Sequence, residues 1–256
     1  MSYVQYDKKE HNTTVGMPEL AAAESIDGEE NSSDDNKMNL SEDMYAFIVV
    51  CSPINISFLI ALYVICLKYV LYAILFHGIN VGNDNSLYNS DRIVQAVKFF
   101  LIPVAVSMQE DLITVYENCA TLKYDEEVLK VSRDATKFKL IIASLLRFID
   151  GLLSLGVNFY VMLSTDEVLN VFLNFAALHF LQGIDDVFFD LVKKGFCGDV
   201  MENMTDVCGQ VKFPRRASNH GCVREIDSIL WGLTLSICLA IYGFVTYRTS
   251  VITWQS

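Results

Sequence analysis

Histidine is scarce in this sequence, and its scarcity excludes one class of membrane enzyme. The 256 residues include four histidines, His11, His77, His179 and His220. This number is too small for the clustered-histidine di-iron sites of membrane hydroxylases. No glycine-rich phosphate loop, nucleophile elbow or Ser/His/Asp constellation is evident either. The sequence therefore predicts no enzymatic activity, no cofactor and no metal site.

Positive charge is also in short supply. The chain has 19 Lys and Arg against 31 Asp and Glu, a net charge of −12, and it has no basic stripe interleaved with aromatic residues. We therefore expect no nucleic-acid partner. No basic segment precedes a short apolar region near the N-terminus, so a cleavable signal peptide is not expected.

Residues 1–43 carry much of the acidic charge and contain no apolar run. They hold eleven Asp or Glu and three Lys among many Ser and Asn. Such a composition cannot bury enough apolar surface to offset the entropy lost on ordering. The sequence predicts a disordered acidic tail over 1–43, followed by a helical membrane domain over 44–256.

Long apolar runs dominate the rest of the chain. Hydrophobic residues make up 52% of the sequence, and a membrane span needs roughly 20 mostly apolar residues. Four stretches are long enough, and a fifth, interrupted by a proline, is shorter. The four lie at 54–76, 138–163, 167–189 and 228–247, and the fifth lies at 93–108. The predicted fold class is an all-α integral membrane helical bundle with four or five transmembrane helices and a disordered N-terminal tail.

The lysines and arginines of the loops predict the orientation of the bundle. The loops at 109–139 and 190–227 are basic, whereas the turn at 164–167 has no Lys or Arg. The positive-inside rule places both basic loops in the cytosol and the C-terminus outside. Five spans then put the acidic tail inside, and four put it outside. The charges beside the first span favour the outside, so the two topologies remain open.

Two charged residues, Arg147 and Asp150, lie near the middle of the span at 138–163. Each costs roughly 2.5–3.5 kcal/mol at the centre of a span, so this helix needs a partner. Polar and small residues recur at helical spacing on one face of this span and of the next one, which allows close packing. The first stripe comprises Ser144, Arg147, Gly151, Ser154 and Asn158, and the second comprises Asn170, Asn174, Ala177, Leu181 and Asp185.

Folding these two spans about the short turn between them brings the stripes to equal depth. Asn158 then meets Asn174, and Arg147 meets Asp185. We predict an antiparallel hairpin in which Asp185 is the counter-charge of Arg147, with Asp150 as a competing partner.

A second polar face of the later span contains Asp186, which points about 100° away from Asp185. Gln182 and Asp190 share this face, and His179 lies a further turn back. The face has no partner within the hairpin. Hydrogen-bonded packing is the simpler role for His179, and a proton relay is the sharper one.

Two functions of different class follow from the buried charges. Ionisable residues inside spans are functional candidates by default, which predicts an oligomeric ion or proton channel or transport subunit. The alternative is a membrane scaffolding or interaction protein whose charges only lock helix packing. Arg147 lies about 18 residues, or roughly 27 Å, from the turn, near the edge of the hydrocarbon layer, and this depth favours a lock. The expected partners are the lipid bilayer and either further copies of the chain or other membrane proteins.

Three short patterns suggest further chemistry. Asp185-Asp186-x-x-x-Asp190 resembles the aspartate-rich motifs of prenyl-transferring enzymes. That chemistry needs a second acidic cluster facing the first, and the sequence offers none at a suitable depth. Ser218 follows two arginines, as in substrates of basic-directed kinases, and is a phosphorylation candidate. The cysteines of the same loop fit no compact zinc pattern, so we expect free thiols.

The pattern N-F-A-A-L-x-F-x-x-x-I-D-D at 174–186 follows "RFIDGLLSLGVNFYVML" at 147–163. Together these segments resemble a group of uncharacterised multi-pass membrane proteins of algae. The likeness covers about 137–200. The resemblance implies that the hairpin is the core unit, and it implies no activity.

Overall fold

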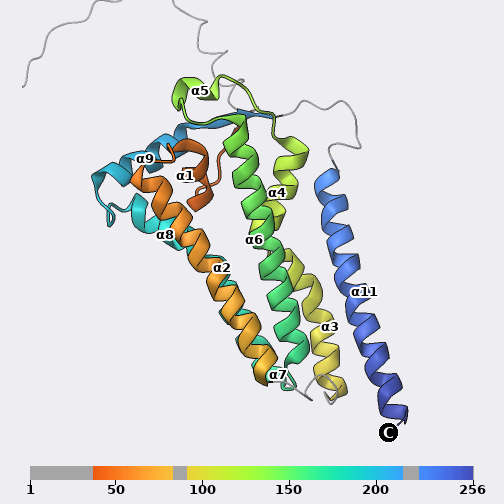
Figure 1. Cartoon of the computed structure of the whole chain (residues 1–256). Coiled ribbons are helices and arrows are strands. Elements are labelled where there is room, and N and C mark those ends of the chain that lie inside the picture. The colour runs from red at the N-terminus through yellow and green to blue at the C-terminus, as the bar shows by residue number, and fades with distance from the viewer. Residues whose placement is uncertain (1–36, 83–90, 216–224, 256) are drawn as a thin grey trace, which may run out of the picture. The chain divides into compact units, whose positions relative to one another are not determined.

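The computed structural model describes residues 37–82, 91–215 and 225–255, which belong to one compact unit, Asn36–Ser256. Within these ranges the chain is almost entirely helical, with one two-stranded sheet (Figure 1). The all-α prediction is confirmed. The predicted disorder of 1–36 and the phosphorylation candidate Ser218 lie outside the described residues.

Five long helices or helix pairs form the body of the bundle. They are α2 (Ile56–Gly82), α3 (Arg92–Ser107) with α4 (Glu110–Thr121), α6 (Lys137–Ser164), α7 (Val168–Gln182) with α8 (Ile184–Lys193), and α11 (Ile226–Gln255). The short elements are β1 (Lys37–Asn39), α1 (Met44–Val50), α5 (Val128–Val131), α9 (Asp199–Gln210) and β2 (Lys212–Pro214). In Figure 1, α2, α6 and α11 all begin at the end that carries the sheet and run towards the opposite end.

Three helices are long and apolar enough to cross a membrane, at Ile56–Gly78, Lys137–Ser164 and Ile226–Arg248. They correspond to the spans predicted at 54–76, 138–163 and 228–247. Two more crossings follow if each bent pair counts as one span. The pair α3 and α4 bends by 49°, and the pair α7 and α8 bends by 42°.

The two remaining predicted spans are therefore not single continuous helices. The short apolar run at 93–108 is the first half of a longer element that resumes at Glu110. The run at 167–189 is divided at Gly183, a residue type that weakens a helix interior. Each second half begins with two carboxylates, Glu110-Asp111 and Asp185-Asp186. Negative charge is favoured there by the positive end of the helix dipole.

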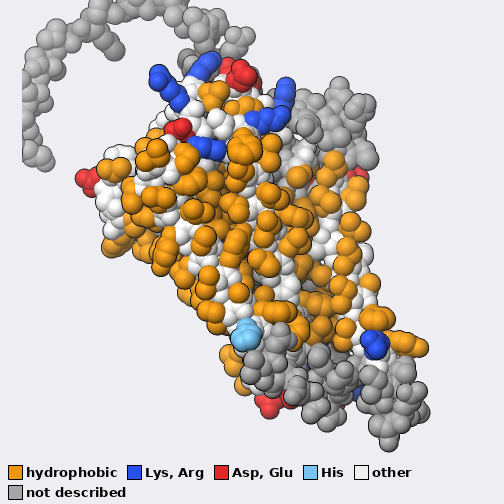
Figure 2. Space-filling model, viewed as in Figure 1, with side chains coloured by type: hydrophobic (Ala, Val, Ile, Leu, Met, Phe, Trp, Pro, Cys, Tyr) orange, Lys and Arg blue, Asp and Glu red, His pale blue; other side chains and the backbone are white. Residues whose placement is uncertain are grey.

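Large apolar side chains cover the outside of the long helices. On α6, Ile141 and Leu145 are each 54% exposed, and on α11 Ile229 is 56% and Leu233 is 55% exposed. Figure 2 shows this apolar surface along the body of the bundle, with most of the visible Lys and Arg side chains at the sheet end. Water-soluble proteins rarely expose contiguous apolar area on this scale. The surface supports a location in a membrane.

Residues 37–43 are ordered, so the predicted boundary of the tail at residue 43 is wrong. Met38 of β1 lies opposite Phe213 of β2 in an antiparallel pairing. Asp43 caps α1, because its Oδ1 accepts a hydrogen bond of 2.9 Å from the backbone N–H of Tyr45. Every residue of α1 is buried. The strand pairing places the end of the acidic tail beside the second basic loop, at one end of the bundle.

We predict that both basic loops face one side of the membrane and that the turn between α6 and α7 faces the other. Single-cysteine variants test this, because Cys197, Glu126 and Asp166 are all exposed. In sealed vesicles, an impermeant maleimide should label Cys197 and Glu126→Cys from the same side. Asp166→Cys should react only from the opposite side. Labelling of all three from one side would contradict five crossings.

Candidate functional site

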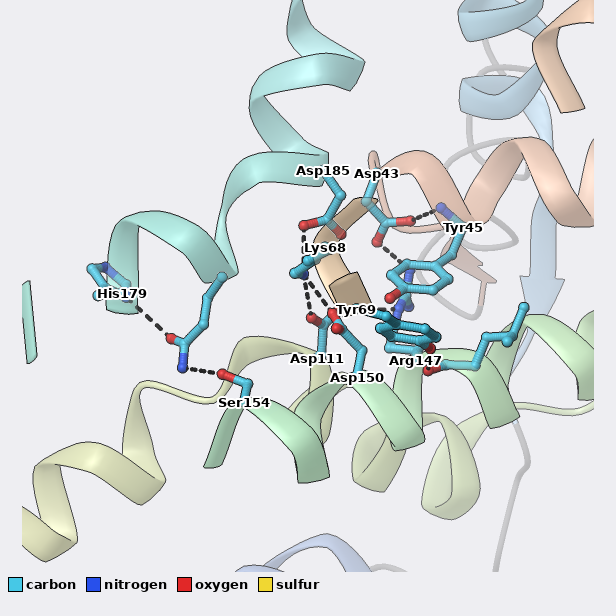
Figure 3. Close-up of polar contacts among 12 residues, drawn as sticks. Asp43, Tyr45, Lys68, Tyr69, Asp111, Arg147, Asp150, Ser154, His179 and Asp185 are labelled. Carbon is cyan, nitrogen blue, oxygen red and sulfur yellow. Dashed lines mark hydrogen bonds and ion pairs between the residues drawn. The ribbon is translucent and has the colours of Figure 1, made fainter. Parts of the chain in front are cut away.

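A lysine at the centre of the bundle is surrounded by three carboxylates (Figure 3). The Nζ of Lys68, on α2, lies 2.5 Å from Oδ2 of Asp150 on α6. The same Nζ lies 2.7 Å from Oδ1 of Asp185 on α8 and 3.1 Å from Oδ2 of Asp111 on α4. The side chains of Lys68 and Asp150 are 0% exposed, whereas that of Asp111 is 18% exposed. One ammonium therefore joins four elements of the bundle away from water.

Arg147 forms the second half of the same cluster. Its Nη1 donates a 2.7 Å hydrogen bond to Oγ of Ser41, and its Nη2 forms an ion pair with Oδ2 of Asp43. Its Nε lies 3.6 Å from Oδ1 of Asp111, and its guanidinium carbon lies 4.9 Å from the ring centre of Tyr45. Asp111 thus faces both cations.

The Asp43 carboxyl shows how dry this half of the cluster is. Burial raises its pKa above the ordinary value, and the charge and hydrogen bond of Arg147 oppose that rise. Asp43 precedes the first span. The N-terminal segment of the folded unit therefore supplies the counter-charge of Arg147, which lies within the span formed by α6.

The predicted pairing of Arg147 with Asp185 is wrong. The partners of Arg147 are Asp43, Ser41 and Asp111, and Asp185 instead contacts Lys68. Asp150 also pairs with Lys68 and does not compete for Arg147. The prediction considered only the hairpin, whereas α2 and the cap of α1 pack against it and supply opposite charges.

Three members of the cluster, Lys68, Asp111 and Asp43, were not among the residues predicted to form a site. Lys68 is fully buried. A signal was available, because Lys68 stands alone in the middle of the most apolar run, where a lysine needs a carboxylate. Asp111 and Asp43 lie at the starts of helices. The positions of these starts depend on breaks in the chain that apolar runs do not reveal.

The other predicted residues lie on α6 and α7, close to the cluster or towards the turn. Asn158 is buried, and Nδ2 of Asn174 donates a 3.1 Å hydrogen bond to Oγ1 of Thr165. Thr165, rather than Asn158, is thus the partner of Asn174. Further along α7, Nε2 of Gln182 donates to Oγ of Ser154. The antiparallel hairpin is confirmed, with a register different from the predicted one.

A half-open pocket of about 580 Å³ adjoins the cluster where the two bent helix pairs break. Asp186 lines it together with Gln182, and Nδ1 of His179 lies 3.4 Å from Oε1 of Gln182. The prediction that this polar face lacks a partner in the hairpin is wrong for Gln182, which bonds Ser154 of α6, whereas Asp186 faces the pocket. All the formally charged side chains in its lining are acidic, namely Glu42, Asp43, Glu110, Asp111 and Asp186. The arrangement can attract a cation or a proton and deliver it to Asp111.

No protein-family model matches this chain, and neither does any curated protein or solved structure. What the site does must therefore be argued from its geometry alone.

The geometry bears on the prenyl-transfer alternative. Asp111 and Asp185 contact the same Nζ of Lys68. The Lys68 ammonium occupies the space between them, where that chemistry would need magnesium. Within the described residues, no group of three or more His, Cys, Asp or Glu is arranged to hold a metal ion. Cys197 and Cys208 are free thiols, and Cys222 and His220 lie outside the described residues.

Gly151 allows α4 to approach α6 beside the cluster. A Cβ at this position would lie 3.0 Å from both Cβ and the backbone N of Leu112, the neighbour of Asp111. The stripe of α6 that contains Gly151 was predicted to pack against the next span. The structure instead places α4 there.

We predict that Gly151→Ala separates α4 from α6 and lowers the free energy of unfolding by about 1–3 kcal/mol, the usual cost of overpacking. Gly156→Ala is the matched control on the same helix, because a Cβ there meets nothing within 4 Å. Unfolding of both variants in mixed detergent micelles measures the difference. Equal stability of the two variants would show that the close contact at Leu112 is not needed.

Proposed function

We propose that this chain is a multi-pass membrane protein that transports protons or small cations, with the cluster around Lys68 as its ion-handling site. The observation that carries the proposal is an excess of acid in a dry place. The buried cluster contains four carboxylates, Asp43, Asp111, Asp150 and Asp185, against two cations, Lys68 and Arg147. A purely structural lock would be expected to balance its charges, because unpaired buried charge is costly.

The depth of the cluster also supports a functional role. Asp150 lies at the midpoint of α6, which has 28 residues, so about 20 Å of helix extends to either side of it. Arg147 lies about one turn of α6 from this midpoint, so it is also close to the centre of the helix. Charges near the centre of a span are expensive, and they commonly mark ion or proton pathways.

The two helix breaks provide the second line of support. Discontinuous spans in transporters place helix ends and freed backbone groups around a site near the middle of the membrane. Here both breaks adjoin the same acidic pocket, which reaches Asp111. Cations are thus favoured in a cavity that adjoins Asp111, the most exposed carboxylate of the cluster.

Buried polar side chains continue from the cluster towards the opposite end of α6. Ser154, Asn158 and Thr165 are 2%, 3% and 8% exposed, and they follow Asp150 along the helix. Gln182 and Asn174 of α7 donate hydrogen bonds to the first and last of these. Hydroxyl and amide groups in such a row can relay protons or solvate a cation between the cluster and the turn.

A scaffolding role is the second candidate, and one observation favours it. The cluster connects the cap of α1 with α2, α4, α6 and α8, so it fixes how these elements pack. For a scaffold, removal of a pocket carboxylate should change assembly at most. For a transporter, the same change should alter flux in a protein that remains folded.

We predict that the purified protein in liposomes moves protons when a potassium diffusion potential is imposed, as reported by a pH-sensitive dye inside. Asp111→Asn should lower the flux by about a hundredfold, the lower range for loss of a proton-transferring group. Asp186→Asn should lower it too, because this residue lines the pocket.

Asp190→Asn is the matched control, since Asp190 is exposed on the same helix as Asp186, one turn further on, and does not line the pocket. Its flux should equal that of the wild type. Absence of flux from folded wild-type protein, for protons and for sodium and potassium alike, would reject transport and favour the scaffold.

A further inference from the structure

The carboxyl group of Asp150 has the most unusual surroundings in the cluster. Its side chain is 0% exposed, and its Oδ1 is a buried oxygen without a hydrogen-bond partner among the described residues. Its Oδ2 contacts only Lys68 as a charged partner. Asp111 contacts the same Nζ of Lys68 from α4, and Figure 3 shows the two carboxyl groups side by side.

Charge balance requires a proton in this part of the cluster. Arg147 is matched by Asp43, which leaves three carboxylates around the single ammonium of Lys68. An uncompensated carboxylate in a dry interior is so costly that the group takes up a proton instead. At least one of the three acids is therefore neutral at rest.

The positions of the three acids identify which one carries the proton. Asp185 and Asp111 lie in the first turns of α8 and α4, where the helix dipole stabilises a negative charge. Asp111 is also partly exposed and faces Arg147 as well as Lys68. Asp150 lies in the middle of α6, far from either helix end, with neither advantage. Ionised Asp150 is thus the most costly of the three.

We propose that Asp150 is a proton-binding site, neutral at rest, and that it exchanges its proton with the pocket through Asp111. In the exchange, the O–H bond of Asp150 breaks and an O–H bond forms on a carboxylate oxygen of Asp111. Asp150 is then a carboxylate beside the Lys68 ammonium, and Asp111 releases the proton into the pocket that it lines. Water in the pocket is the base that accepts this proton, and the reverse steps return a proton to Asp150.

Charged and titratable groups from several elements surround Asp150. These groups are Lys68, Tyr69 and Tyr72 from α2, Asp43 and Tyr45 from the α1 region, Asp111 from α4, Arg147 from α6 itself, and Asp185 from α8. The two cations favour release of the proton, and the carboxylates favour its retention. The proton itself follows from charge and burial, whereas its use as the transported or coupled species rests on the proposed function.

Infrared spectroscopy of the full chain in lipid at neutral pH tests the proposal without measuring transport. The wild type should show the carbonyl stretch of a protonated carboxylic acid, and Asp150→Asn should lose it. Asp190→Asn, which changes an exposed acid outside the cluster, should retain it. If Asp150→Asn does not fold, Asp150→Glu keeps a carboxyl group at the site and should shift the frequency of the same band. No such band in the wild type, or an unchanged band in the folded Asp150 variant, would overturn the proposal.

The exchange step has its own readout. On transfer to D₂O the band should shift as the proton is replaced by deuterium, and Asp111→Asn should slow that shift. An unchanged rate would overturn the role of Asp111 as the exit. Because the band and the flux are independent, a band without flux would reject transport alone, and flux without a band would reject the proton site alone.

Discussion

The interior of this bundle depends on how one ammonium, that of Lys68, is neutralised away from water. An isolated charge in such a place costs several kcal/mol or more, so it determines which elements must meet around it. Carboxylates from α4, α6 and α8 converge on the lysine of α2. Two of these carboxylates stand at helix starts created by the breaks in the bent pairs, where the helix dipole favours them. The helix breaks, the close approach at Gly151 and the ordered segment that caps α1 all help to bring the charged residues of the cluster together.

The same cluster could serve only to hold the helices together, or it could also handle ions. The ratio of its acids to its cations bears on which role it has. A lock is best served by equal numbers of opposite charges, fully buried. Here the acids outnumber the cations, and Asp111 remains partly open to an acidic pocket. An excess of acid that communicates with water is suited to taking up and releasing a cation or a proton. Structural and functional roles are compatible, because a site that moves charge through a membrane also has to be held rigidly in place.

Much of the fold could be predicted from the sequence, because whether a helix can cross a membrane depends on the length and composition of one run of residues. The helices α2, α6 and α11 follow directly from apolar length, and the hairpin follows from polar spacing and a short turn. The partners of Arg147 and Asp185 could not be found in this way, because pairing depends on which helices meet. Lys68 and Asp43 reach the hairpin from elements far away in sequence. The break at Gly183 could have been found, since two aspartates directly after a glycine resemble the first turn of a new helix.

Unfolding in detergent tests most directly whether the Lys68 ammonium holds the carboxylates together. Lys68→Met should lower the free energy of unfolding by about 3–5 kcal/mol, because it leaves buried carboxylates without their cation. Adding Asp185→Leu should restore a substantial part of that loss, whereas adding Asp186→Leu at the neighbouring position should restore none. A Lys68→Met protein as stable as the wild type would show that the ammonium does not hold the carboxylates together.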